Sequence, residues 1–210
     1  MLPNLRNLIT TLVLVFLLSA CSGRNVFESA CDVGNCKLQG SHSYDGGNDT
    51  YTLTGAGTNI WGQSDEFYMV WKKVSGDFTI SARIAFDGKG VHAHRKMGLM
   101  VRESLLPGAR YADVAVHGDG LTSLQYRREK DDLTLEIKSE QQFPDHIVLE
   151  RKGETILMKT GTGVYPELPD ANLELNLPQE CYVGLFICSH DPEALETGYF
   201  SDVNLKQVVK

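Results

Sequence analysis

The sequence has no long apolar run, no excess of basic charge and no cysteine pair with the spacing of a zinc site. The longest apolar stretch, residues 8–18, is too short to span a bilayer comfortably. Acidic side chains outnumber basic ones by 27 to 20, which gives a formal charge of −7. An acidic chain is repelled at long range by nucleic acid and by anionic lipid, so neither is expected to attract it. The five cysteines include no CxxC pair, which argues against a structural zinc site.

The hydrophobic period of an amphipathic helix is also missing, and short runs of alternating polarity take its place. In residues 78–86 apolar side chains recur at every second position, the period of a β strand with one buried face. Strands are predicted at residues 50–54, 66–74, 78–86, 96–103, 111–117, 121–127, 133–138, 146–152, 155–160, 182–189 and 198–205. About a dozen strands predict an all-β fold, a two-sheet antiparallel β-sandwich of the jelly-roll type.

The N-terminal residues have the pattern of an export signal. A single positive charge, Arg6, precedes the apolar run, and the run ends in Leu18-Ser-Ala-Cys21, which resembles a bacterial lipobox. In that motif the cysteine is acylated and becomes the first residue of the mature protein, so Cys21 is the predicted lipidation site. The predicted organisation is a lipoprotein signal peptide at 1–20, a lipid-anchored tether at 21–40 and the sandwich domain at 41–210.

The lipid anchor would attach the protein to a membrane outside the cytoplasm. Ser22, rather than Asp, follows the cysteine and favours delivery to the outer membrane. In an oxidising compartment Cys31 and Cys36 could form a disulfide that closes a small loop. Cys181 and Cys188 lie seven residues apart in one strand and therefore on opposite faces, so they are interpreted as buried, unbonded side chains.

Several segments resemble a known family. They are residues 51–61, 65–72, 96–104, 111–120 and 184–192, for example the strand and turn Tyr-Ala-Asp-Val-Ala-Val-His-Gly-Asp-Gly at 111–120. Together they resemble the concanavalin A-like lectin/glucanase superfamily, in its bacterial branch similar to the "regulation of enolase protein 1" domain. The resemblance covers about 41–205 and implies a concanavalin A-like jelly roll, but it implies no catalytic residues. A fold by itself does not establish a glycan site.

Strand parity predicts a polar surface on the side of the sheet away from the core. Small side chains there would leave space, charged planar groups would bind sugar hydroxyls or carboxylates, and an aromatic ring would stack on a sugar ring. The candidate ligand-binding residues are Arg83, Arg102, Tyr111, Asp113, His117, Gln125, Arg127 and Trp61. The alternative is an ordinary solvated face whose charges pair with one another, for example Arg102 with Asp113.

The residue types present suggest two candidate metal sites. His92 and His94 would share one side of a strand but lack a third ligand, so a polar loop is the favoured interpretation. Hard oxygen ligands for a structural calcium ion are offered by a glycine-containing turn and by the last strand. The candidate calcium ligands are Asp45, Asn48, Asp49 and Asp202. No other cofactor is expected.

The predicted function is non-catalytic binding of a glycan or another component of the cell envelope. One alternative is a carbohydrate-active hydrolase or lyase that uses Asp113 and Glu136 as its two carboxylates. Glucanases of the superfamily use a Glu-x-Asp-x-x-Glu strand motif, which this sequence lacks. A second alternative is a protein-interaction domain of an envelope complex, for which a flat exposed apolar patch would be the mark.

Overall fold

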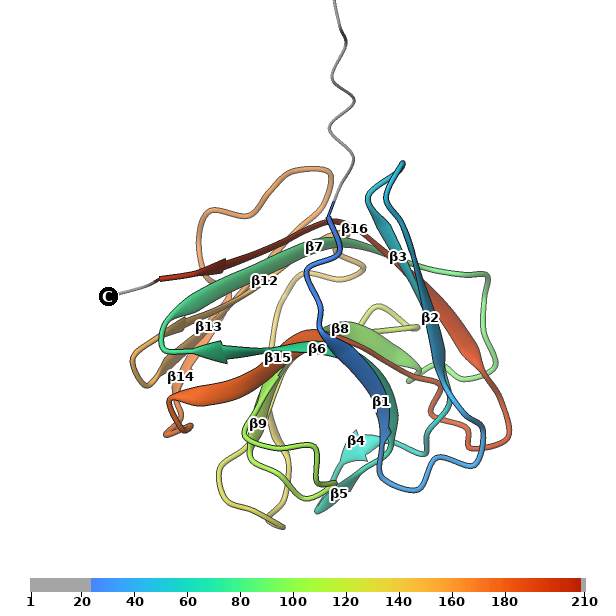
Figure 1. Cartoon of the computed structure of the whole chain (residues 1–210), viewed down its shortest axis with the longest axis horizontal. Helices are drawn as coiled ribbons and strands as arrows, with labels where there is room; N and C mark the ends of the chain where they lie inside the picture. Colours follow the sequence, from blue (N-terminus) through green and yellow to red (C-terminus); the bar gives the residue numbers. More distant parts are fainter. Residues whose placement is uncertain (1–23, 209–210) are drawn as a thin grey trace, which may run out of the picture.

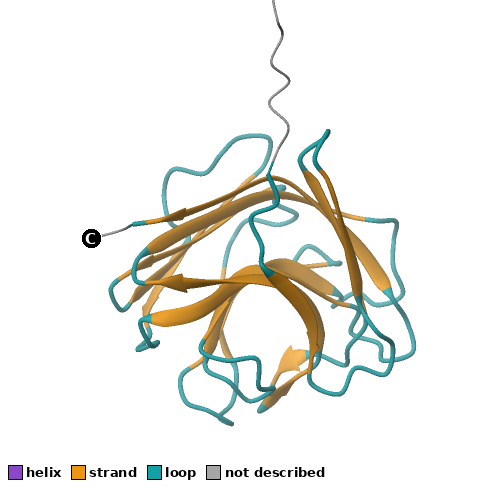
Figure 2. Cartoon of the chain, viewed as in Figure 1, coloured by secondary structure: helices purple, strands orange, loops and turns teal. Residues whose placement is uncertain are grey.

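The computed structural model describes residues 24–208, which form two antiparallel sheets packed face to face (Figures 1 and 2). The predicted two-sheet sandwich is confirmed, and no helix occurs in residues 24–208. Accordingly, nothing in this range is a helix long and apolar enough to cross a membrane. The predicted signal peptide and the lipidation site Cys21 lie outside the described residues.

Each large sheet has seven strands. The first sheet contains, in spatial order, β1 (Ser29–Val33), β6 (Phe67–Ser75), β15 (Glu180–Cys188), β8 (Lys96–Arg102), β9 (Tyr111–His117), β10 (Thr122–Arg127) and β11 (Leu135–Lys138). The second contains β14 (Ala171–Glu174), β13 (Thr155–Gly161), β12 (His146–Lys152), β7 (Phe78–Phe86), β16 (Glu196–Gln207), β3 (Thr50–Gly55) and β2 (Ser41–Asp45). A small hairpin joins β4 (Ile60–Trp61) to β5 (Ser64–Asp65).

The eleven predicted strands are all present, with ends that move by a few residues. The structure adds β1, which pairs with β6 through Ser29↔Trp71 to Val33↔Phe67. This strand lies inside the segment predicted as a tether, so part of residues 21–40 belongs to the sandwich. Short strands such as β2, whose residues are mostly polar and exposed, have little periodic signal of their own and were not predicted.

The main core lies between the two sheets, and strand parity places its side chains correctly. Alternate residues of β7 point into it, and Ile80 is fully buried there. The inward residues of the neighbouring sheet, for example Leu99 and Val114, are fully buried against them. Burial of such side chains stabilises the fold by roughly 1.5–3 kcal/mol each. The first sheet therefore has one face in this core and a second face, here called the far face, turned away from it.

None of the four described cysteines forms a disulfide. Cys181 and Cys188 are buried and unbonded, as predicted. Cys31 and Cys36 are half-buried and unbonded, so the small disulfide loop is not formed, and burial raises the pKa of the Cys36 thiol to about 12.

Candidate functional site

The far face of the first sheet is not a free surface over its whole width. The first sheet curves around the β4–β5 hairpin (Figure 1), and this hairpin with its neighbouring loops covers part of that face. A second cluster of buried apolar side chains forms beneath the cover. Its members are Val33, Ile60, Phe67, Met69, Met100, Tyr111, Ala115, Phe186 and Cys188. Part of the predicted polar surface is therefore a second core.

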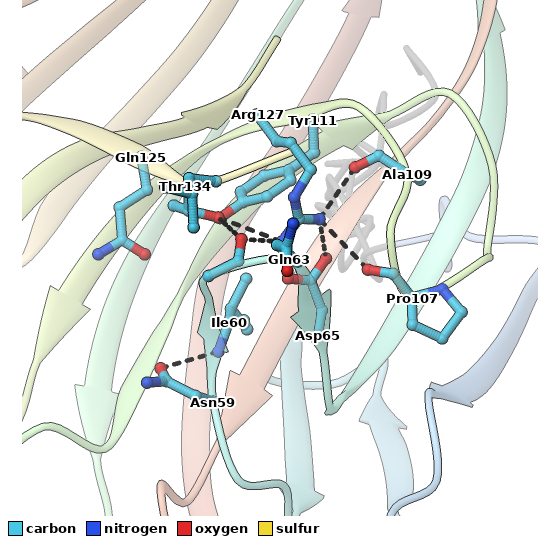
Figure 3. Close-up of polar contacts among 12 residues, drawn as sticks. Asn59, Ile60, Gln63, Asp65, Pro107, Ala109, Tyr111, Gln125, Arg127 and Thr134 are labelled. Carbon is cyan, nitrogen blue, oxygen red and sulfur yellow. Dashed lines mark hydrogen bonds and ion pairs between the residues drawn. The ribbon is translucent and has the colours of Figure 1, made fainter. Parts of the chain in front are cut away.

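Arg127 fixes the hairpin to the sheet. Its guanidinium donates two hydrogen bonds to Asp65, of 2.8 Å from Nη1 to Oδ2 and 2.7 Å from Nη2 to Oδ1 (Figure 3). The same group donates to the backbone carbonyls of Gly62, Pro107 and Ala109 at 2.9–3.2 Å. Both side chains of the ion pair are fully buried. Every direction of the guanidinium is thus occupied by the protein, and Arg127 is closed to a ligand.

Arg102 and Tyr111 belong to the same buried network. Arg102 donates to the carbonyls of Ser104 and Leu106, each at 2.6 Å, and lies 3.5 Å from Asp65. The Tyr111 ring lies under the Arg127 guanidinium, whose carbon is 5.0 Å from the ring centre. Neither side chain is exposed. Parity places these residues on the predicted face, but they hold loops in place rather than contact a ligand.

Asp113 is buried on the same face, where it lies directly opposite Gln125 on the neighbouring strand. Its carboxylate approaches the backbone of Gln125, yet neither oxygen has a hydrogen-bond partner among the described residues. Burial raises the pKa of this carboxyl well above its usual value. Gln125 also pairs with Glu136, so the two carboxylates share a face with Gln125 between them. A two-carboxylate mechanism needs both groups to reach the substrate, and Asp113 is inaccessible.

Arg83 does not join the other candidate residues. It lies on β7, which belongs to the second sheet between β12 and β16. Its side chain is half exposed there and faces Asp145 at 3.5 Å. The prediction assumed that strands adjacent in sequence are adjacent in one sheet, and the chain instead crosses to the other sheet after β7.

The uncovered part of the far face contains an open pocket of about 320 Å³. Trp61, His117 and Gln125, three of the predicted ligand residues, lie in it together. Glu136, one carboxylate of the predicted hydrolase alternative, and His94, from the histidine pair considered for a metal, also line it. Sequence reasoning did not place the remaining lining residues at a site. They are Asn59, Lys96, Leu121, Lys138 and His190. The Trp61 ring, from the covering hairpin, is 40% exposed. An aromatic ring beside polar side chains is a common arrangement for binding amphipathic ligands.

Lys96 forms the base of this pocket. Its Nζ donates to Asn59 Oδ1 at 3.0 Å, the Ile60 carbonyl at 3.4 Å and Gln125 Oε1 at 3.5 Å. The residue is only 2% exposed, and this burial lowers the pKa of its ammonium group. Strand parity could have identified it, because Lys96 lies two positions before Gly98 on the far face of β8.

Imidazoles line one side of the pocket. The His94 ring centre lies 5.9 Å from that of His117 and 5.8 Å from that of His190. His117 Nδ1 lies 2.9 Å from the Leu121 carbonyl, which can only accept, so Nδ1 carries the proton and Nε2 is left without it. Burial, reinforced by the charge of Lys96, lowers the pKa of His117 to about 4 and that of His190 below its usual value. These two rings are therefore neutral at pH 7.

The structure gives the predicted His92–His94 pair a third imidazole, but not a metal site. His92 and His190 stack with ring centres 4.3 Å apart and planes 10° apart. Stacked rings point their nitrogen lone pairs outward in parallel rather than toward one point. Within residues 24–208 there is no group of three or more His, Cys, Asp or Glu side chains that could hold a metal ion.

The candidate calcium ligands do not converge either. Asp45 Oδ1 accepts from the Gly47 N–H at 2.8 Å and its Oδ2 from Asn48 at 2.7 Å, so this carboxylate caps its own turn. Asp49 accepts from the Tyr44 hydroxyl at 2.8 Å. Asp202 lies at the β-bulge of β16 with a φ of 53°. These carboxylates do not form such a group in the described part of the chain, and the turn is stable through its own hydrogen bonds.

A larger hollow of about 650 Å³ lies near the other end of the sandwich. Its one buried charged group, Arg151, donates to the carbonyls of Gly153, Leu177 and Pro178 at 2.7–2.9 Å. These bonds occupy the guanidinium, so the hollow offers less to a ligand than the pocket at Trp61 does.

Comparison with known proteins supports the fold. No protein-family model matches the chain, and no curated protein matches it. A functionally unknown protein from Saccharomyces cerevisiae has a similar structure, with a TM-score of 0.61 and 14% identity over 81% of this chain and 93% of that one. The carbohydrate binding module CBM66 from Bacillus subtilis is similar with a TM-score of 0.56 and 12% identity, over 88% and 99% of the two chains. Both similarities concern the fold, which is a two-sheet antiparallel β-sandwich of the jelly-roll type.

Proposed function

We propose that this protein binds carbohydrate in the pocket beside Trp61, without catalysis. The observation that carries the proposal is the half-exposed Trp61 ring next to Lys96 and Gln125, whose polar ends are held in place by hydrogen bonds. A sugar ring has an apolar face for the indole and hydroxyls for the polar groups. The similarity to a carbohydrate binding module supports the same function but carries less weight, because a fold hosts many activities.

A non-catalytic role agrees with the arrangement of the carboxylates. Glu136 lines the pocket and is paired with Lys138 at 3.3 Å. Asp113, the second carboxylate of the hydrolase alternative, is fully buried. The pocket therefore offers a ligand one carboxylate, and the two-carboxylate mechanism needs two.

We further propose that the chain is anchored through lipid on Cys21 outside the cytoplasm, at the outer membrane. The lipobox-like sequence supports this placement. The glycan partner would then be a component of the cell envelope or of its surroundings. Labelling of cells with a fatty-acid analogue tests the anchor: wild-type protein should incorporate label and the Cys21→Ala variant should not. Equal incorporation in both would contradict it.

Calorimetric titration against a panel of polysaccharides tests the binding site. At least one glycan should bind, and Trp61→Ala should weaken it by about tenfold or more, equivalent to about 1.4 kcal/mol. Tyr199→Ala is the matched control, because Tyr199 is 38% exposed but lies on the second sheet. This variant should bind as wild type does. Loss of affinity in Tyr199→Ala with no loss in Trp61→Ala would show that the glycan binds on the second sheet and not in this pocket.

A further inference from the structure

The ammonium group of Lys96 is buried and makes no direct contact with a carboxylate of residues 24–208, although Asp113 acts on it electrostatically. Its three hydrogen-bond acceptors, on Asn59, Ile60 and Gln125, are all uncharged oxygens. None of the ion pairs found in residues 24–208 includes Lys96. Burial of a charge is costly unless it is paired, so proteins rarely keep such a group without a use for it.

The other charged residues that line the pocket also leave an excess of positive charge. Two of the lining residues, Lys96 and Lys138, are cations, and Glu136 is the one carboxylate among them. Three histidines also line it, and protonation of any of them adds positive charge. Asp119 lies outside this lining, 3.6 Å from His94. A protein with a net charge of −7 thus has a small cavity in which positive charge exceeds negative charge.

The closest acidic group on the far face does not correct this imbalance. Asp113 lies below Gln125, and its carboxylate makes no ion pair with Lys96 in the described structure. Asp65, the next acid along, is held by Arg127 and Arg102. The ammonium group of Lys96 thus contacts neutral oxygens in the described structure, two of them only at 3.4 and 3.5 Å, and a carboxylate in the pocket would replace these two longer contacts.

We propose that the pocket selects an acidic sugar, a hexuronate, with its ring on Trp61 and its carboxylate toward Lys96. This inference depends on the proposed carbohydrate function. Lys96 Nζ contacts the backbone of Ile60, the residue before Trp61, so the indole and the ammonium group are neighbours, as the ring and the carboxylate of a uronate are. A carboxylate would accept hydrogen bonds from this group with both partners ionised, whereas a neutral hydroxyl would leave the donor as the single charge. A neutral sugar would leave the buried charge unpaired.

Titration of uronate polymers and their methyl esters tests this selectivity, because esterification removes the charge and keeps the ring. The probes are polygalacturonate, polymannuronate, polyguluronate and a glucuronan, each with its methyl ester, and neutral mannan and glucan. One acidic polymer should bind at least about tenfold more tightly than its ester, and added salt should reduce this difference.

Variants separate the contribution of the buried charge from that of folding. Lys96→Met should bind acid and ester with equal affinity while the Trp61-dependent part of binding remains. If Lys96→Met does not fold, Lys138→Gln, at an exposed position, should still reduce the preference for the acid. Lys73→Gln is the control, because Lys73 is an exposed residue of β6 that pairs with Glu180 outside the pocket; the preference should be unchanged.

The outcomes distinguish this inference from the proposed function. Binding through Trp61 that is equal for acid and ester, or best for a neutral glycan, would support the carbohydrate function and overturn the uronate selectivity. Absence of binding to every glycan would contradict both. A preference for acid that persists in Lys96→Met and Lys138→Gln would overturn the role of these lysines.

Discussion

Asp65 accepts two hydrogen bonds from Arg127 in a pair that is wholly buried between the covering hairpin and the far face of the first sheet (Figure 3). The pair joins the hairpin that bears Trp61 to the strand that bears Gln125. The position of the exposed indole above the sheet thus depends on a buried salt bridge. Stability and binding are connected at this point of the structure.

Removal of this pair should strongly destabilise the protein. Asp65→Ala leaves the Arg127 guanidinium buried without its counter-ion, which typically costs 3–5 kcal/mol. The free energy of unfolding in urea measures the loss. Arg83→Ala removes a half-exposed ion pair and should cost less than about 1 kcal/mol. A loss in Asp65→Ala as small as that of the control would show that the pair does not hold the hairpin.

Asp113→Asn should alter how stability depends on pH. The folded-state pKa of Asp113 is raised, so the folded protein binds more protons than the unfolded chain between the unfolded pKa near 3.9 and the folded pKa. Stability of the wild type is therefore lost across that window as pH rises. The Asp113→Asn variant has no carboxyl to ionise at this position, so its free energy of unfolding relative to that of the wild type should increase with pH. Parallel pH profiles would contradict the buried, unpaired carboxyl.

His117 changes the pH dependence of stability in the opposite direction. Its folded-state pKa of about 4 lies below the unfolded value near 6.5, so the unfolded chain binds the extra proton first. Stability is present above pH 6.5 and is lost as pH falls to about 4, by about 3 kcal/mol. An NMR titration of the imidazole resonances should give a midpoint near 4 for His117. A midpoint near 6.5 would mean that the ring is open to solvent.

Strand periodicity was sufficient to predict the sandwich and the direction of most side chains. Leu99 and Val114 face the core, while Tyr111 and Arg127 face the other way, as parity requires. These properties are local, since they depend on the alternation within one strand. The membership of β7 in the second sheet is a property of topology, and for this reason Arg83 was misplaced.

The covering of the far face could not be read from the strands. Residues 59–65 contain Ile60 and Asp65, and nothing in that short segment shows that it folds back under strands 40–60 residues further along the chain. Because the hairpin and its loops cover them, Arg102 and Arg127 bind Asp65 and loop carbonyls instead of a ligand. Strand parity is sufficient to place Lys96 on the far face. His190 follows the end of β15, and its position in the pocket depends on tertiary contacts that parity does not predict.

The most direct test of the account is an NMR titration that compares the two indole N–H resonances of the protein during addition of a glycan. Trp61 lines the pocket and is exposed, while Trp71 packs against the second buried cluster. The Trp61 resonance should shift with the ligand in a saturable manner, and the Trp71 resonance should not move. A glycan that binds while the Trp61 resonance stays unchanged would contradict the claim that this pocket is the carbohydrate site.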